Sequence, residues 1–140
     1  MTHKLSNDFY YALVSFLMQA KQQVLLIAGE FGLTGVQALT LLSIHSNHQK
    51  SMSDLCKQYA CDASNITGIV DGLEEKGLVS RQPHPNDRRV KIIHLEKDGH
   101  LLQAKLLERI AESGPHLFNG LTKTEIQQFA GLIQKISPLS

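Results

Sequence analysis

Two adjacent helical patterns, followed by a strand–turn–strand pattern, constrain the fold of this chain more than any other feature. The second helix is expected after Asp62, because its apolar side chains recur at spacings of three and four and therefore share one face. Those side chains are Ile66, Ile69, Val70 and Leu73. Asp62 stands at the N-cap position, where a carboxylate accepts hydrogen bonds from the free amides of the first turn.

The first helix of the pair is predicted to start at Ser51-x-x-Asp54, a spacing typical of a capping box. Its expected apolar face consists of Met52, Leu55, Cys56 and Tyr59. Only Ala60 and Cys61 separate the two helices, which favours the tight turn of a helix-turn-helix.

A β-hairpin is predicted directly after the helix pair. Strands are expected over residues 79–83 and 90–95, and residues 84–89 between them are turn formers followed by arginines. Gly77 stands where a glycine in the left-handed conformation would end the second helix. A helix-turn-helix followed by a hairpin with a basic tip describes a winged helix. The predicted fold class is therefore mostly α with a small β-hairpin wing.

Further helices are expected at about residues 6–28, 34–47, 98–113 and 122–136. The helix at 34–47 is apolar on most sides and is therefore expected to be central and largely buried, whereas the others are amphipathic. Capping-box patterns start the helices at Thr34 and Thr122, and Gly114-Pro115 is expected to break the third. The chain is expected to form a single domain over residues 1–140. Its winged helix-turn-helix lobe would cover about 34–98, and its dimerisation helices about 5–30 and 99–137.

The outer helices carry apolar faces that a winged-helix lobe does not need. A second copy of the same chain would cover them, so a homodimer is one arrangement that these faces allow. The alternative is that these helices cover the hydrophobic core of their own monomer.

The N-terminal half of the second helix is the candidate DNA-reading surface, because its outward face is small and polar. Its members are Ser64, Asn65, Thr67 and Gly68. The other half is acidic, with Asp71, Glu74 and Glu75, and would be repelled by phosphate. Asn65 is suited to a bidentate contact with adenine. The alternative is that Ser64 and Asn65 only assist the helix cap.

Residues 55–102 closely resemble the MarR family of bacterial transcription regulators. The resemblance is carried by SNITGIVDGLEEKGLV, PNDRRVKIIHL and KDG, and more loosely by LTGVQALTLL at 33–42 and LTKTEIQQFAGLI at 121–133. It implies a homodimeric repressor that binds a double-stranded DNA operator and is often released by a small molecule or by oxidation.

The resemblance also implies roles for the basic residues of the hairpin, which are Arg81, Arg88, Arg89 and Lys91. Arg89 would enter the minor groove, held by Asp87, while Arg81 and Arg88 would reach phosphates or support the wing. Many relatives carry a basic residue where this chain has Gly72. Because of this departure, the resemblance does not imply which operator sequence the protein binds.

A small aromatic or phenolic effector is a further implication of the resemblance. Such ligands often bind between the dimerisation helices and the DNA-binding lobe. Candidate lining residues are Phe16, Leu17, Phe31 and His45. The alternative is that these side chains belong to the core.

Other function classes find less support in the sequence. No nucleotide-binding glycine loop, nucleophile motif or carboxylate pair indicates an enzyme or a cofactor. No run of about 18 apolar residues predicts a membrane span, and no signal peptide is apparent. Two cysteines in a chain without an export signal favour a cytoplasmic protein with reduced thiols. Because the net charge is only +1, a DNA-binding protein of this composition must concentrate its positive charge locally.

Three alternative modes of action stay open. His45 and His48 could begin a metal site, although no cysteine or carboxylate lies nearby at ligand spacing. Cys61 lies just ahead of the reading helix and could act as a redox switch, but Cys56 and Cys61 both occupy positions expected to be apolar. A winged helix can also bind a protein partner, as an adaptor would.

Overall fold

The computed structural model describes residues 4–45, 49–59 and 63–138. Its helices are α1 (Asn7–Glu30), α2 (Gly35–Ser43), α3 (Met52–Tyr59), α4 (Ala63–Glu75), α5 (Lys97–Ser113), the short 3-10 helix η1 (Gly114–Phe118) and α6 (Lys123–Ile136). Its strands are β1 (Lys50–Ser51), β2 (Val79–His84) and β3 (Asp87–Leu95), which form an antiparallel sheet in the order β1-β3-β2. The predicted fold class, mostly helical with a small hairpin wing, is confirmed.

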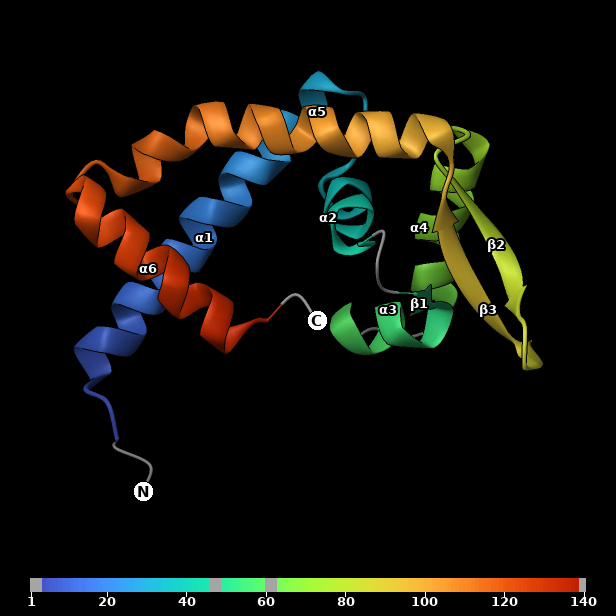
Figure 1. Cartoon of the computed structure of the whole chain (residues 1–140), viewed down its shortest axis with the longest axis horizontal. Helices are drawn as coiled ribbons and strands as arrows, with labels where there is room; N and C mark the ends of the chain where they lie inside the picture. The colour runs from blue at the N-terminus through green and yellow to red at the C-terminus, as the bar shows by residue number, and fades with distance from the viewer. Residues whose placement is uncertain (1–3, 46–48, 60–62, 139–140) are drawn as a thin grey trace.

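Helix α5 connects two parts of the molecule (Figure 1). At its N-terminal end lie α3, α4 and the sheet, with α2 beside them. At the other end the chain turns through η1 into α6, which crosses the N-terminal half of α1. The wing and α6 therefore lie at opposite ends of the molecule.

Three capping boxes predicted from the sequence are present. Gln37 N donates to Thr34 Oγ1 at 3.2 Å, and Thr34 N donates to Gln37 Oε1 at 3.0 Å. The corresponding pairs of bonds join Ser51 to Asp54 and Thr122 to Glu125. Each pair satisfies backbone amides that have no partner within the helix, which fixes the first residue of α2, α3 and α6.

Several element boundaries differ from the prediction. The hairpin turn consists of residues 85–86 alone, because β3 already begins at Asp87. Helix α2 ends at Ser43, earlier than expected. Strand β1 was not predicted: Lys50 pairs with Ile93 and Ser51 with Ile92. Strand β1 has only two residues and its pairing partners lie far away in the sequence, so no local sequence pattern indicates it.

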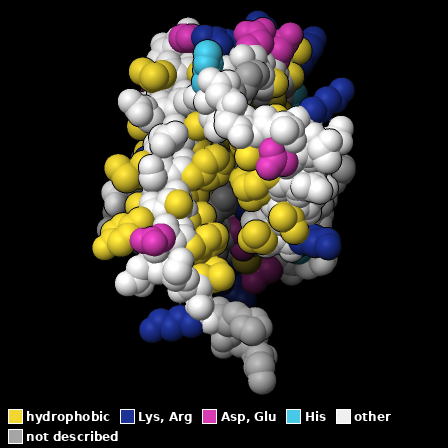
Figure 2. All heavy atoms as spheres, turned by 90° about the vertical axis from the view of Figure 1, so that its left-hand side faces the viewer, with side chains coloured by type: hydrophobic (Ala, Val, Ile, Leu, Met, Phe, Trp, Pro, Cys, Tyr) yellow, Lys and Arg dark blue, Asp and Glu magenta, His cyan; other side chains and the backbone are white. Residues whose placement is uncertain are grey.

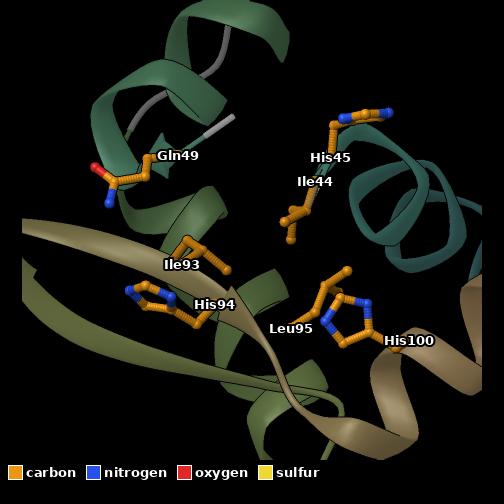
Figure 3. Close-up of a pocket in the computed structure, with 7 residues that line it drawn as sticks. All are labelled: Ile44, His45, Gln49, Ile93, His94, Leu95 and His100. Carbon is orange, nitrogen blue, oxygen red and sulfur yellow. The ribbon is translucent and has the colours of Figure 1, made fainter. Parts of the chain in front are cut away.

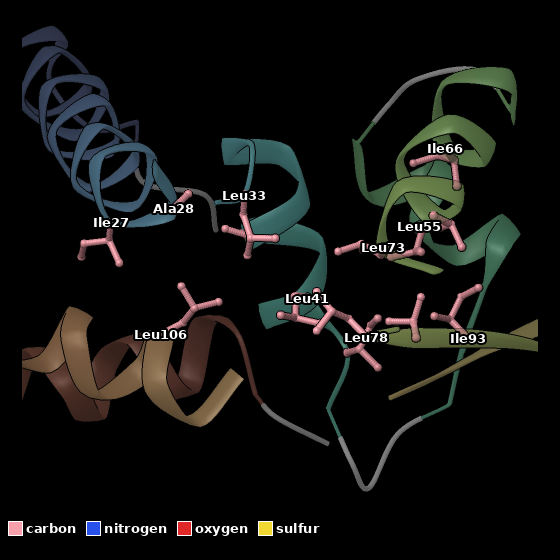
Figure 4. Packing of buried hydrophobic residues seen from close by; sticks show 14 residues of the cluster. Ile27, Ala28, Leu33, Leu41, Leu55, Ile66, Leu73, Leu78, Ile93 and Leu106 are labelled. Atoms are coloured by element: carbon pink, nitrogen blue, oxygen red, sulfur yellow. The ribbon is translucent and has the colours of Figure 1, made fainter. Parts of the chain in front are cut away.

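The core lies around α2, as its apolar sequence predicted (Figure 4). Ala38, Thr40 and Leu41 of α2 are completely buried. Towards the sheet, the core continues through the buried side chains Leu55, Ile66, Val70, Leu73, Leu78 and Ile93. Towards α1 and α5 it continues through Ile27, Ala28, Leu33 and Leu106. One continuous core therefore joins the winged-helix lobe to the outer helices.

A set of polar contacts holds α5 against the lobe. Gln103 Nε2 donates to the carbonyl oxygens of Leu41 and Ile44 at 2.8 and 2.7 Å, which satisfies acceptors at the end of α2. The backbone amide of Glu96 donates to the carbonyl oxygen of Leu78 at 2.9 Å. These bonds fix the position of α5 relative to α2 and to the start of β2.

Apolar side chains are exposed on the outer helices (Figure 2). On α1 they include Phe9, Tyr11, Val14, Leu17, Met18 and Leu26, and on α6 Ile126, Leu132, Ile133 and Ile136. Among the described residues, α6 has no buried side chain, and no large apolar side chain of α3, α4, β2 or β3 is exposed to this degree. The monomer's own core therefore does not cover these faces.

Helix α1 also departs from one expectation. The sequence led us to expect no membrane-spanning segment, yet the 24 residues of α1 are long and apolar enough to cross a membrane by length and composition alone. Polar residues, among them Gln19, Lys21 and Gln22, lie in the middle of this helix.

Candidate nucleic-acid interface

Helix α4 has the two faces that its sequence predicted. Ile66, Val70 and Leu73 are buried, whereas Asn65, Thr67 and Gly68 are exposed. Ser64 lies in the first turn of α4, but its side chain is outside the described part of the chain, as are the predicted N-cap Asp62 and the predicted turn. At the other end of the helix Gly77 adopts a positive φ of 72°, which confirms it as the residue that ends the helix.

The wing presents its cations to solvent. Arg88, Arg89 and Lys91 are exposed on β3, close to the hairpin turn. The turn itself is supported by His84, whose Nδ1 accepts a hydrogen bond from the backbone amide of Asn86 at 3.0 Å. A strand fixes the spacing of these side chains more firmly than the longer turn expected from the sequence.

Asp87 holds Arg89 from two directions. Its Oδ1 accepts from Arg89 Nε and from the Arg89 backbone amide, each at 3.1 Å, and its Oδ2 accepts from Nη2 at 3.3 Å. The Arg89 side chain is nevertheless 90% exposed. The side-chain and backbone hydrogen bonds from Arg89 hold the pKa of Asp87 below its ordinary value, so the carboxylate stays charged at neutral pH. Asp87 thus orients a guanidinium that remains open to a ligand.

Arg81 is placed differently from the other wing cations. Its Nη2 lies 2.5 Å from Asp71 Oδ1 and 2.6 Å from Glu74 Oε2, both on α4. Its backbone amide donates to Glu74 Oε1 at 3.2 Å. The side-chain hydrogen bond from Arg81 lowers the pKa of Glu74, and the bond to Glu74 raises the pKa of Arg81. Of the two roles that the sequence left open for Arg81, this geometry favours support of the wing.

The polar face of α4 and the wing meet at a hollow of about 360 Å³. Its wall contains Thr67 of α4 and both Arg89 and Lys91 of β3. Ser53 also lines it, from the first turn of α3. Sequence reasoning missed Ser53, although its place two residues after the capping residue Ser51, in the first turn of the helix, was a usable signal. Donors from three elements therefore surround one concave surface.

Gly72 does not belong to that surface. A Cβ atom at Gly72 would lie 2.6 Å from Gln37 Nε2, so this residue faces α2. Gln37 is held in place by the capping box at the start of α2. The glycine therefore leaves room for the Gln37 side chain that caps α2, which is a packing reason for the departure from the family pattern.

The candidate effector residues lie in separate environments. The Phe16 ring contacts those of Phe118 and Phe129, with centroids 6.2 and 5.7 Å apart. Leu17 is 56% exposed, and Phe31 packs at the edge of the core. Because an α-helix rises about 1.5 Å per residue, Phe16 and Phe31 are roughly 20 Å apart. The two side chains therefore lie far apart along α1 and its C-terminal end.

His45 lies in a small pocket between the end of α2, β3 and the start of α5 (Figure 3). The pocket is lined by Ile44, His45, Gln49, Ile93, His94, Leu95 and His100. Within the described residues, no group of three or more histidine, cysteine or acidic side chains is arranged to hold a metal ion. His48, the second residue of the metal hypothesis, lies outside them.

The cysteines offer limited evidence for a redox switch. Cys56 is half-buried and packs against the core from α3, as its apolar position predicted. Cys61, the residue on which the redox hypothesis depended, lies outside the described residues.

A family model and several solved structures are similar to this chain. The MarR family model matches residues 33–91. A MarR-family transcriptional regulator from Rhodococcus sp. RHA1 is 26% identical, with a TM-score of 0.77 and 99% of each chain covered. CouR from Rhodococcus jostii RHA1, solved bound to p-coumaroyl-CoA, is also 26% identical, with a TM-score of 0.72, and the match covers 99% of this chain and 98% of CouR.

A mutant of MarR from E. coli matches in two structures. Alone it is 21% identical with a TM-score of 0.78, covering 98% of this chain and 100% of that chain. Complexed with operator DNA it is 22% identical with a TM-score of 0.70, covering 97% of this chain and 100% of that chain. The resemblance drawn from the sequence is therefore confirmed: residues 33–91 match the MarR family model, and the chain shares its fold with MarR-family regulators.

Proposed function

We propose that this protein is a sequence-specific, DNA-binding transcription regulator that acts as a homodimeric repressor. The observation that carries the proposal is the position of Arg89, which is held by Asp87 yet 90% exposed beside the polar face of α4. The operator complex of a protein with the same fold supports it. Such a role belongs in the cytoplasm, where the operator is found.

The two parts of the interface suit different grooves. The N-terminal half of α4, with Asn65 and Thr67 exposed, has the dimensions and polarity of a helix that enters the major groove. Arg89 on the wing would then lie over the neighbouring minor groove, where the negative potential favours a guanidinium. Arg88 and Lys91 would contact phosphates, which give affinity without sequence preference.

The proposal is tested by selecting DNA fragments from a genomic library with the purified protein. We expect enrichment of imperfect palindromes with half-sites about 10 base pairs apart, because a two-fold dimer places its two α4 helices about one helical turn apart. Equal recovery of all fragments would argue against sequence-specific regulation and favour a nonspecific or adaptor role.

Asn65→Ala should relax sequence preference without abolishing binding. Loss of a bidentate contact to one base costs about 1–3 kcal/mol per half-site, and only on the selected sequence. The measurement compares the affinities for the selected site and for sites altered at each base pair. Lys91→Ala provides the contrast, since loss of a phosphate contact should weaken binding to all of these sites equally. A preference profile unchanged in Asn65→Ala would remove this residue from the reading surface.

Gly68→Ala should raise the stability of the fold and weaken DNA binding at the same time. A Cβ at this helical position meets nothing within 4 Å, so alanine should stabilise α4 by about 1 kcal/mol. The same methyl group projects from the proposed DNA-facing surface and should weaken operator binding. Thermal unfolding and DNA titration of one variant test both statements. Operator binding as tight as that of the parent would show that DNA does not approach α4 closely at Gly68.

The dimer is the second component of the proposal. The exposed apolar side chains of α1 and α6 need cover, and a second copy presents the same surface. We assign dimerisation to helices at about 5–30 and 99–137, and DNA binding to the lobe at about 34–98. The polar residues within α1 favour a protein partner over a lipid environment.

Sedimentation equilibrium at micromolar concentration should give twice the chain mass of 15.5 kDa. Replacement of Met18 and Ile136, which are 67% and 76% exposed, by lysine should shift the mass towards that of the monomer. A monomer mass for the parent protein would contradict the dimer.

Release by a small organic effector is the third component. The structure of CouR with p-coumaroyl-CoA supports it, because that protein shares the fold over nearly its whole length. We propose an aromatic or phenolic ligand, and we assign no lining residues within one protomer.

A further inference from the structure

The C-terminal half of α4 carries only negative charge. Asp71, Glu74 and Glu75 lie within the helix, and no lysine or arginine does. The carbonyl end of a helix adds a partial negative charge of its own. Both would repel the phosphates of a duplex that the N-terminal half of α4 enters. Lys76, directly after the helix, supplies one positive charge against these three carboxylates, so the recognition helix needs a further cation at this end.

Arg81 supplies that cation from the wing. Asp71 and Glu74 are three positions apart, so their side chains leave α4 on the same side, and one nitrogen of Arg81 contacts both. Glu74 uses its second oxygen to accept the backbone amide of Arg81. Strand β2 is an edge of the sheet, and this bond satisfies an amide that no neighbouring strand can reach. The contact thus joins the wing to the helix through side chain and backbone together.

We propose that Arg81 is a positioning residue that does not contact DNA: it screens the acidic end of α4 and fixes the wing against the recognition helix. The proposal rests on the DNA-binding function proposed above. It replaces the phosphate contact that family resemblance allowed for this residue.

The exposure of the side chains supports this assignment. The Arg81 side chain is 27% exposed, against 90% for Arg89. Both carboxylates already contact Arg81 Nη2, so a phosphate would compete with them for the charge of this side chain. The bond to Arg81 also holds the pKa of Glu74 below its ordinary value, so the carboxylate is ionised when the protein binds at neutral pH.

The test is a mutant cycle measured by fluorescence anisotropy at several salt concentrations, on the duplex that the parent protein selects. Arg81→Gln should weaken binding by roughly 30-fold, because two carboxylates lose their counter-charge. Adding Asp71→Asn and Glu74→Gln to that variant should restore affinity to within about 3-fold of the parent. Without the charges of Asp71 and Glu74 the phosphates are no longer repelled, so the cation at residue 81 is no longer needed.

The control is the same pair of carboxylate substitutions combined with Arg88→Gln. Arg88 is exposed on the wing, so its loss should not be rescued beyond the small gain that Asp71→Asn/Glu74→Gln produces in the parent. Arg81→Lys keeps the charge but lacks the planar fork, and should bind more tightly than Arg81→Gln. If Arg81→Gln fails to fold, Arg81→Lys with and without the carboxylate substitutions completes the cycle.

Two results would overturn the proposal. A triple variant as weak as Arg81→Gln would mean that Arg81 does not act by screening the two carboxylates, and an Arg81→Gln variant as tight as the parent would mean that it has no role. A readout without DNA separates this proposal from the function on which it rests. The NMR-measured pKa of Glu74 should rise to its ordinary range in Arg81→Gln, whether or not the parent selects any DNA.

Discussion

Arg89→Ala should weaken operator binding by roughly 100-fold at physiological salt. Each contact of this kind contributes about 1–3 kcal/mol, and a dimer loses one on each wing. The salt dependence should become shallower by about one unit per wing, because fewer counterions are released on binding. The measurement is a DNA titration of parent and variant at several salt concentrations.

Two further variants identify the cause of the Arg89 effect. Lys105→Ala removes the same charge from an exposed position on α5, outside the lobe, and should change affinity by less than about 2-fold. Asp87→Asn removes a negative charge near the DNA, so simple electrostatics predicts tighter binding. We expect weaker binding, because the hydrogen bonds that orient Arg89 are reduced. An Arg89→Ala protein with the parent's affinity at every salt concentration would refute the wing assignment.

Gly99→Ala should destabilise the protein by about 3 kcal/mol and lower its Tm by roughly 10 °C. A Cβ at Gly99 would lie 2.0 Å from the backbone oxygen of Leu78, a distance that real atoms do not adopt. That oxygen cannot move freely, since it accepts the amide of Glu96 at 2.9 Å. The first turn of α5 must therefore shift away from the lobe. Thermal unfolding at one fixed protein concentration measures the effect.

Gly68→Ala is the matched control for this prediction, because the same added methyl group meets no atom there. The two variants should move Tm in opposite directions. Since Gly99 lies where the lobe joins α5, its substitution should also weaken operator binding more than the loss of stability explains. A Tm unchanged in Gly99→Ala would show that the contact between α5 and Leu78 relaxes at no cost.

The helices were predictable because their signals are local. A capping box is complete within four residues, so Thr34, Ser51 and Thr122 marked the starts of three helices before any tertiary contact was known. The apolar stripe of α4 and the break after α5 are local in the same sense. The basic wing could be located, although its turn proved shorter and its strand longer than expected.

The sequence by itself determined the order of the elements, the faces that α4 buries and exposes, and the presence of cations on the wing. Only the tertiary structure decided which cation is available for DNA. The family resemblance left two roles open for Arg81, and the structure holds this residue between two carboxylates of α4, whereas Arg89 is held by Asp87 and exposed.

The glycines divide in the same way. Gly72 faces Gln37 and Gly99 faces Leu78, while Gly68 faces open space. The physical reason is common to both cases: hydrogen-bonded caps and apolar periodicity depend on neighbours along the chain, whereas charge pairing and close approach depend on residues that folding brings together.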